Sequence, residues 1–241
     1  MLKPHEGAAS PEELARLVAV GEPFGTMLAS MYASDPQPGA DGTLVAIDDT
    51  TRISVPEGLA LHSQVIVHGV TSTLEVGLAY GFSTLYLLAG LAANGGGTHI
   101  AIDPYQATDW HGVGETAARR GTALSPALSG DSLRLIEQRS EDALPELRRA
   151  GESFGVIFID GYHRFDDVLV DVTLAAPMCP VGGVVVLHDM WLDSIAAVAS
   201  FLRHNRTDFT EIDTGCDNLF AMRRVAHDQR NWDHFAAFPM R

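Results

Sequence analysis

Four side chains that can move protons or bind cations follow two apolar segments late in the chain. Asp160 and His163 come after the apolar run 154–159, and His188 and Asp189 follow the apolar run 184–187. Short continuous apolar runs are typical of strands buried on both faces of a parallel sheet. Because ligands bind beyond the carboxyl ends of such strands, we expect these four residues to meet at one site. Carboxylates beside imidazoles favour acid–base chemistry there.

Each of these residues also has a structural interpretation. Isolated Asp and His residues at strand ends commonly cap helices or satisfy loops, and His163 could instead bond to Asp166 or Asp167 in the next helix. Burying a core does not require four such residues at adjacent strand ends, so we favour chemistry. A histidine with a near-neutral pKa suits a general base, which predicts His163 in that role, with His188 as the alternative.

A glycine turn earlier in the chain predicts where a ligand approaches the backbone. The segment Leu74-Glu75-Val76-Gly77 ends an apolar strand, and Gly81 opens an apolar helix that we expect to reach about Ala93. A helix N-terminus offers unpaired N–H groups to such a ligand. The two glycines do not fit the dinucleotide pattern G-x-G-x-x-G, and no Gly-Lys-Ser/Thr follows as in a P-loop. Glycines also occur at strand–helix junctions for purely steric reasons.

Acidic residues beside this turn narrow the kind of ligand. Glu75, just before the first glycine, would repel a pyrophosphate but would suit an amine-bearing ligand. Asp103 follows the next expected strand and can accept both hydrogen bonds of a ribose diol. Because Pro104 comes next, Asp103 could instead cap a turn, but beside the glycine turn we favour the ribose role.

This pattern resembles motif I of the class I S-adenosylmethionine-dependent methyltransferases. Over about Pro56–Arg223 the chain looks closest to the small-molecule O-methyltransferases, of the catechol type and of the bacterial type that modifies sugars and natural products. The resemblance implies S-adenosylmethionine as cofactor and transfer of its methyl group to a hydroxyl. The cofactor-binding residues that it implies, together with those argued above, are Glu75, Gly77, Ala79, Tyr80, Gly81, Ser83, Asp103, Ser140, Glu141 and Asp160.

In metal-dependent members of this family, acidic residues after the fourth and fifth strands hold a divalent cation. Asp160 and Asp189 match two ligand positions, whereas His188 stands where an acid usually lies. Histidine suits Zn, Fe, Mn or Ni better than Mg. The resemblance therefore leaves two alternatives, a divalent metal held by Asp160, His188 and Asp189, or a metal-independent enzyme. For the acceptor pocket we expect the aromatic residues Trp110, Tyr162 and Trp191, although Trp110 could instead dock the following helix.

The elements that must position these residues form a Rossmann-like α/β domain over 56–226. After a helix at 56–69, expected strands at 73–76, 98–102, 133–138, 154–159, 182–187, 208–213 and 218–223 alternate with helices at 82–93, 111–120, 141–149, 164–176 and 193–204. Strand–helix alternation predicts a doubly wound, mostly parallel sheet with helices on both faces. The short link 214–217 between the last two strands predicts that they run antiparallel.

Two further segments flank this domain. An N-terminal helical arm, 1–55, has expected helices at 11–20 and 23–32 and a loop at 35–42. It resembles the extension that related enzymes use to cover the pocket or to dimerise, so we expect a homodimer or higher homo-oligomer. The C-terminal tail, 227–241, has aromatic residues that we expect to pack on the domain or on a partner subunit.

Composition excludes several classes of protein. A formal net charge of -15 makes a nucleic-acid partner a poor match. The two cysteines, Cys179 and Cys216, predict no disulfide framework and indicate a reducing cytoplasm. No apolar run approaches membrane-spanning length, and Met1–Ser10 lacks a signal core, so we expect a cytoplasmic protein without a membrane partner.

Three other functions stay open. A nicotinamide oxidoreductase would need the dinucleotide glycine pattern that is missing. A non-catalytic cofactor-binding partner would not need Asp160, His163 and Asp189 together. A metal-dependent hydroxylase or hydrolase on the same fold would differ by not binding the methyl donor.

Overall fold

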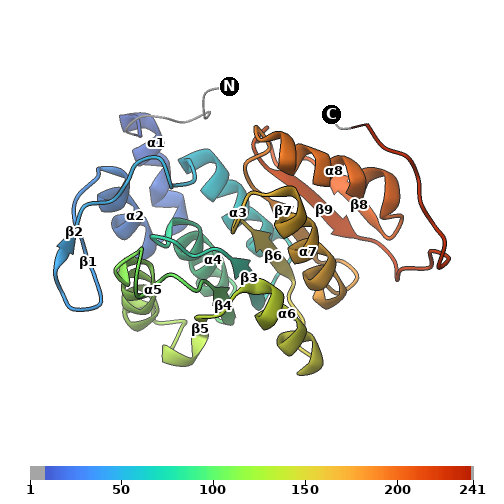
Figure 1. The fold of residues 1–241 in the computed structure, drawn as a ribbon. Coiled ribbons are helices and arrows are strands. Elements are labelled where there is room, and N and C mark those ends of the chain that lie inside the picture. Colours follow the sequence, from blue (N-terminus) through green and yellow to red (C-terminus); the bar gives the residue numbers. More distant parts are fainter. Residues whose placement is uncertain (1–8, 240–241) are drawn as a thin grey trace.

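The computed structural model describes residues 9–239, and Figure 1 shows a twisted central sheet with helices on both faces. The first eight residues of the arm and the last two of the tail lie outside the described residues. The sheet has seven strands in the order β5-β4-β3-β6-β7-β9-β8. Its strands are β3 (Ser72–Val76), β4 (Thr98–Ile102), β5 (Leu133–Ile136), β6 (Val156–Ile159), β7 (Val184–Leu187), β8 (Phe209–Ile212) and β9 (Phe220–Arg224). This arrangement confirms the Rossmann-like doubly wound fold.

Helices connect these strands or precede them. The α-helices are α1 (Pro11–Arg16), α2 (Phe24–Tyr32), α3 (Val55–Val67), α4 (Phe82–Ala93), α5 (Val113–Leu124), α6 (Ser140–Arg149), α7 (Phe165–Ala175) and α8 (Asp193–Asn205). Short 3-10 helices lie at η1 (Leu17–Val20), η2 (Gly130–Ser132) and η3 (Ala176–Met178). The helix expected at 11–20 is therefore α-helical only to Arg16.

The register of the sheet brings the ends of its parallel strands to one level. Val76 at the end of β3 pairs with Ile102 of β4 and with Ile159 of β6, and Ile159 pairs with Leu187 of β7. The residues that follow these strands therefore start at the same edge of the sheet. Strand β9 runs antiparallel to both β7 and β8, as the short link between the last two strands predicts.

Two apolar clusters cover the two faces of the sheet. One joins the arm to α3, α4 and α5, with Phe24, Leu61 and Leu85 among its buried members. The other joins α6, α7 and α8, with Leu144 and Val172 among its members. Helix α2 of the arm shares this cluster with α4, which begins directly after the glycine turn.

Some local features differ from the sequence-based expectations. The loop expected at 35–42 contains β1 (Gln37–Pro38), which pairs antiparallel with β2 (Leu44–Val45). Two-residue strands that include a proline carry no alternating pattern to reveal them. In the tail, Phe238 packs on Phe201 of α8 with ring centres 5.5 Å apart, as expected, but Trp232 is 98% exposed. No helix among the described residues combines the length and apolarity needed to cross a membrane.

Candidate active site

The glycine turn between β3 and α4 brings two strand ends into close contact. Gly77 has φ +92°, and a Cβ placed there would lie 2.2 Å from the carbonyl oxygen of Asp160, so the position accepts no side chain. Gly81 caps α4 with φ +87°, which also favours glycine. Both glycines therefore serve steric needs, and the same geometry leaves open space beside the turn.

Glu75, the acid before the first glycine, does not face the ligand side of the turn. Its carboxylate is fully buried, accepts a hydrogen bond from the Thr84 hydroxyl and lies 3.3 Å from His99 Nε2. It lines neither of the two cavities described below, so the expected contact with an amino group has no direct route in this structure. The alternation of the strand, which gives Glu75 the face covered by α4, is what turns it away.

A first cavity of about 160 Å³ lies beyond the ends of β3, β4 and β6. It brings together six of the residues predicted to bind the cofactor: Gly77, Ala79, Asp103, Ser140, Glu141 and Asp160. Tyr105 and Tyr162 also line it, and their hydroxyl oxygens lie 2.6 Å apart. The cavity is therefore where the sequence predicts a nucleoside to lie.

Asp103 fits both roles considered for it, that of a turn cap and that of a ribose-binding residue. One carboxylate oxygen accepts hydrogen bonds from the N–H groups of Leu78 (3.2 Å) and Ala79 (2.8 Å), and the other accepts one from the N–H of Tyr105 (2.8 Å). The residue thus fixes the glycine turn, as a cap would. It also lines the first cavity, so its carboxylate lies within the cavity wall where a diol could bind.

A second cavity of about 170 Å³ adjoins the first and shares Gly77, Ala79, Trp110, Asp160 and Gly161 with it. The turn residues 77–83 form one part of its lining, and all four of the acids and histidines predicted at the strand ends form another. Residues Thr50–Ile53 of the arm also line it. Sequence reasoning missed this arm segment, because nothing in its composition marks a binding site.

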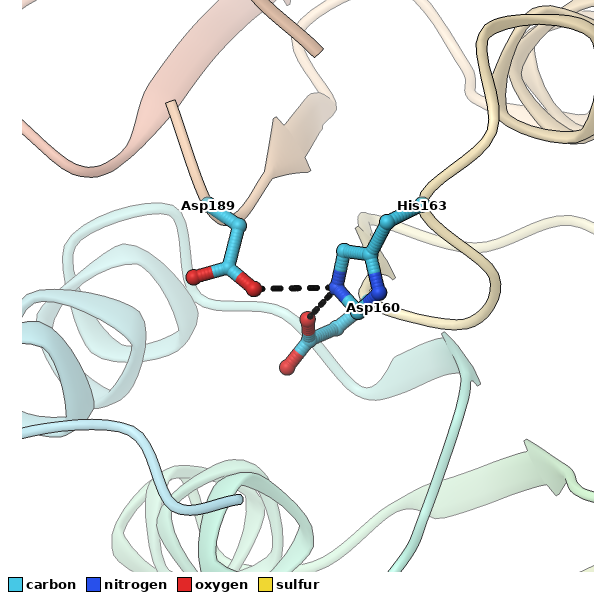
Figure 2. Close-up of side chains that lie close together, drawn as sticks. All are labelled: Asp160, His163 and Asp189. Atoms are coloured by element: carbon cyan, nitrogen blue, oxygen red, sulfur yellow. Dashed lines mark ion pairs between the residues drawn. The ribbon is translucent and has the colours of Figure 1, made fainter. Parts of the chain in front are cut away.

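Asp160, His163 and Asp189 converge in the second cavity (Figure 2). His163 Nε2 lies 2.9 Å from Asp189 Oδ2 and 3.6 Å from Asp160 Oδ1. The three residues can offer one ligand atom each within 4.8 Å of one another. Asp189 has φ +61°, a strained conformation for a residue other than glycine, which suits a functional site. The alternative partners of His163, Asp166 and Asp167, are not the ones it contacts.

These carboxylates control the charge of His163. Partial burial lowers the pKa of the imidazole, but hydrogen bonds and attraction from Asp160 and Asp189 outweigh it and raise the pKa to about 9. In return, the pKa of the Asp189 carboxyl is held well below its usual range by His163 and His188, despite burial. A pKa near 9 means that His163 carries a proton at neutral pH.

His188 lies behind this group and is only 4% exposed. Its Nδ1 lies 3.1 Å from Asp160 Oδ1 and 3.4 Å from Asp189 Oδ1, while its Nε2 lies 3.5 Å from Glu57 Oε2. Burial alone would lower the pKa of His188, but the three carboxylates raise it well above its usual value. The ring thus lies among three carboxylates that favour its protonated form, and each of its nitrogens faces at least one of them.

Two residues of this network escaped sequence reasoning. Glu57 is 1% exposed and belongs to the capping box of α3 with Ser54, a pattern that indicates a helix start and nothing more. Asn218, just before β9, donates a hydrogen bond to Glu57 (2.9 Å) and lies 3.5 Å from Asp189. Only the fold brings these distant residues to the strand ends.

The aromatic residues predicted for the acceptor do not share one pocket. Trp110 lines both cavities and packs on Tyr80 with ring centres 5.1 Å apart, whereas Tyr162 lines only the first cavity. Trp191 lies on the other side of Asp189, donating its indole N–H to that carboxylate at 2.8 Å, and lines a third cavity with Glu57 and Asn218. Trp191 thus contacts the site through Asp189.

Comparison with known proteins identifies similarity to methyltransferases, in agreement with the resemblance seen in the sequence. Residues 74–190 match the family Methyltransf_24, described as a methyltransferase domain. No curated protein sequence matches the chain. Among solved structures, the O-methyltransferase TomG from Streptomyces achromogenes, in complex with S-adenosylmethionine, is 17% identical with a TM-score of 0.57, covering 91% of this chain and 92% of TomG.

Two further solved structures extend this likeness. An O-methyltransferase from Bacillus cereus, in complex with S-adenosylhomocysteine, is 17% identical with a TM-score of 0.56, over 90% of this chain and 92% of that one. The methyltransferase PaMTH1 of Podospora anserina, bound to S-adenosylhomocysteine, is 15% identical with a TM-score of 0.62, over 91% and 99%. At such identities the likeness establishes the fold.

Proposed function

Residues 74–190 match a methyltransferase domain, and from that premise we propose that the chain transfers the methyl group of S-adenosylmethionine to a hydroxyl of a small molecule. The observation that carries the proposal is the contact between two cavities. The first is lined by the residues predicted to bind the nucleoside, and at Asp160 it adjoins the cavity that holds His163 and Asp189. Donor and acceptor would thus meet at Asp160.

The lining of these cavities fits the cofactor part by part. Ser140 and Glu141 would contact the adenine, Asp103 the ribose, and the turn 77–83 the methionine end. When bound, S-adenosylmethionine supplies a methyl group already activated on a sulfonium. The protein must therefore mainly align the acceptor with it and exclude water. That S-adenosylmethionine or S-adenosylhomocysteine is bound in structurally similar proteins supports this assignment.

His163 is the residue that we propose to take the proton from the acceptor hydroxyl. Its side chain is 42% exposed and so can be reached from the cavity, whereas His188 is buried among carboxylates. Asp160 and Asp189 would orient the imidazole and stabilise its charged form once the proton has moved. Because those carboxylates also hold a proton on His163 at neutral pH, the base must first release it. His188 is the alternative base.

A divalent metal is a second means of activating the hydroxyl. The two carboxylates and one imidazole of Asp160, Asp189 and His163 form a donor set that suits Mn, Fe or Zn better than Mg. His188, which stands where the family pattern has an acidic ligand, faces the same carboxylates. A bound metal would polarise the acceptor oxygen and lower its pKa. Elemental analysis of the purified protein, together with Mn²⁺ titration of wild type and Asp160→Asn, tests this version.

The proposed function is tested by calorimetry with S-adenosylhomocysteine, with and without EDTA. We expect binding at micromolar concentrations to one site per chain. Adenosine alone is the control, because it fills the first cavity but lacks the amino-acid part. An absence of S-adenosylhomocysteine binding at millimolar concentration would contradict the proposal and would favour a hydroxylase or hydrolase. Binding without methyl transfer to any of a panel of hydroxyl compounds would favour a non-catalytic partner.

A further inference from the structure

We propose that Arg52, in the N-terminal arm, binds the carboxylate of the cofactor's methionine part. The proposal rests on the proposed function and assigns a cofactor-binding role to a residue outside the matched domain. It follows from where the guanidinium lies, how it is held and which charges face the same cavity.

Arg52 lies in the wall of the second cavity, and contacts within the arm hold its side chain. Its side chain is only 4% exposed, yet Arg52 lines the second cavity with the turn 77–83 and the group at Asp160. Its Nη1 lies 2.9 Å from Asp49 Oδ1 and 3.4 Å from the carbonyl oxygen of Tyr32, and its guanidinium carbon lies 5.6 Å from the centre of the Tyr32 ring. These contacts fix the orientation of a side chain that is otherwise flexible.

A guanidinium carries five N–H donors in one plane and can hold more than one carboxylate. Its acidic partner Asp49 is 44% exposed and so is itself in contact with solvent. A ligand carboxylate could therefore bind beside Asp49 without leaving a buried acid unpaired.

The charges around the second cavity match an amino acid in its zwitterionic form. Among the described residues that line this cavity, the basic ones are Arg52, His163 and His188, and the two histidines already pair with Asp160 and Asp189. The start of α4, at Phe82 and Ser83, lines the same cavity and adds N–H groups that favour an anion. Asp160 turns its Oδ1 towards His163 and His188, which leaves its Oδ2 to face a cationic group. An α-carboxylate at Arg52 and a cationic ammonium near Asp160 would satisfy both sets of charges.

Arg52 could instead serve only to fasten the arm to the domain through Asp49 and Tyr32. The two roles differ in one measurable respect. A fastening residue affects every ligand of the cavity alike, whereas a carboxylate-binding residue affects only ligands that carry the carboxylate.

The experiment compares two probes by calorimetry. S-adenosylhomocysteine carries the carboxylate, and its decarboxylated analogue keeps the adenosine, the thioether and the amine but lacks the carboxylate. We expect Arg52→Gln to weaken binding of S-adenosylhomocysteine at least tenfold and to change binding of the analogue less than twofold. Arg52→Lys, which keeps the charge, should recover part of the loss. Arg164→Gln is the matched control, because Arg164 is 68% exposed, pairs with Asp167 and does not line this cavity.

Two outcomes would overturn the proposal. Equal weakening of both probes by Arg52→Gln would assign Arg52 to holding the arm in place, and unchanged binding of S-adenosylhomocysteine would remove it from the site. If wild-type protein bound neither probe, the proposed function would fail together with this inference. That result differs from the first two, in which wild type still binds S-adenosylhomocysteine. Thermal unfolding of each variant shows whether its fold is intact.

Discussion

His163 lies in contact with the carboxylates of Asp160 and Asp189, which stabilise its protonated form. This contact makes the ring a stronger base, but the ring must lose a proton before it can accept one. The same acids that raise its pKa to about 9 would stabilise the imidazolium formed after proton transfer. With this pKa the ring is already charged at neutral pH. The chemistry of the site therefore depends on how the carboxylates of Asp160 and Asp189 are neutralised or shared when the acceptor binds.

We expect His163→Ala to lose methyl transfer while keeping its affinity for S-adenosylhomocysteine. Loss of a general base typically slows a reaction by about 10²–10⁴-fold, and His163 lines the second cavity but is not one of the residues assigned to the cofactor. S-adenosylhomocysteine formed from a panel of hydroxyl acceptors measures turnover, and calorimetry measures affinity. Wild-type turnover in this variant would remove His163 from the mechanism.

The rate should also depend on pH in a defined direction. Because a base acts only when deprotonated and the pKa of His163 is raised to about 9, the rate at subsaturating acceptor should increase as the pH rises from 7 towards 9. In Asp189→Asn, which removes one attracting carboxylate, the rise should occur at lower pH. A flat profile over this range in wild type would contradict the assignment.

Glu57 stabilises the fold through His188. Burial raises the pKa of the Glu57 carboxyl, but interactions with His188 and Ser54 lower it to about 2. A lowered carboxyl pKa contributes stability above the unfolded-state pKa, and this contribution is lost as the pH falls towards 2. We therefore expect Glu57→Gln, which can keep the capping box, to lower the free energy of unfolding by about 1–3 kcal/mol at pH 7.

Urea unfolding of this variant at pH 7 and at pH 3 checks the prediction. The deficit should shrink at the lower pH, because part of the charge on Glu57 is lost there in the unfolded chain. An equal deficit at both values would assign the loss to packing or to the cap instead of to charge.

At the scale of elements, the pattern of apolar runs was enough to predict every strand of the main sheet and the helices between them. Residues that follow a strand directly, such as Asp160 and His188, could be placed together because register aligns the strand ends. Glu75 could not be placed, since which face of β3 it takes depends on α4. Glu57 reaches the site from a helix that precedes the sheet, and no local pattern encodes that tertiary contact.

Helix α7 contains an acid that opposes folding. Burial raises the pKa of the Asp171 carboxyl to about 6, although a hydrogen bond with Ser140 works against the shift. A raised carboxyl pKa means that the folded protein prefers the protonated form, so stability falls as the pH rises from about 4 to 6. We expect Asp171→Asn to raise the free energy of unfolding by about 2 kcal/mol at pH 7.5 and to have little effect at pH 4.

Denaturant unfolding at the two pH values measures this difference. Asp166→Asn, on the same helix but exposed, is the control and should change little at either pH. Destabilisation by Asp171→Asn at pH 7.5 would show that the ionised carboxylate makes a favourable contact.

At the scale of the whole molecule, segments at both ends of the chain pack against the sheet domain. The arm shares the core of α4 and lines the second cavity at 50–53. The tail packs beside α8, where the buried side chain of Asn205 donates to the carbonyl of Ala236 (2.9 Å) and accepts from its N–H (2.8 Å). Contact of the arm or the tail with a second subunit stays a prediction from the sequence.

Removal of the tail should therefore destabilise the domain without affecting the site. We expect truncation after Ala226 to lower the free energy of unfolding by about 1–3 kcal/mol, because Asn205 loses two partners and Phe201 loses its contact with Phe238. Binding of S-adenosylhomocysteine should be unchanged. Thermal unfolding and calorimetry of the truncated chain measure the two effects, and Asn205→Ala in the full chain should reproduce part of the loss.

The position of Trp110 has an optical consequence. The chain has three tryptophans, and Trp110 is the one that lines both cavities, while Trp232 is 98% exposed to solvent. Stacking or contact with a bound purine would quench the indole emission of Trp110, whereas Trp232 would add a constant red-shifted background. Replacing Trp232 with Phe would remove that background and leave Trp110 and Trp191, of which only Trp110 lines the nucleoside cavity. A change in emission on binding would then report occupancy of that cavity without any added label.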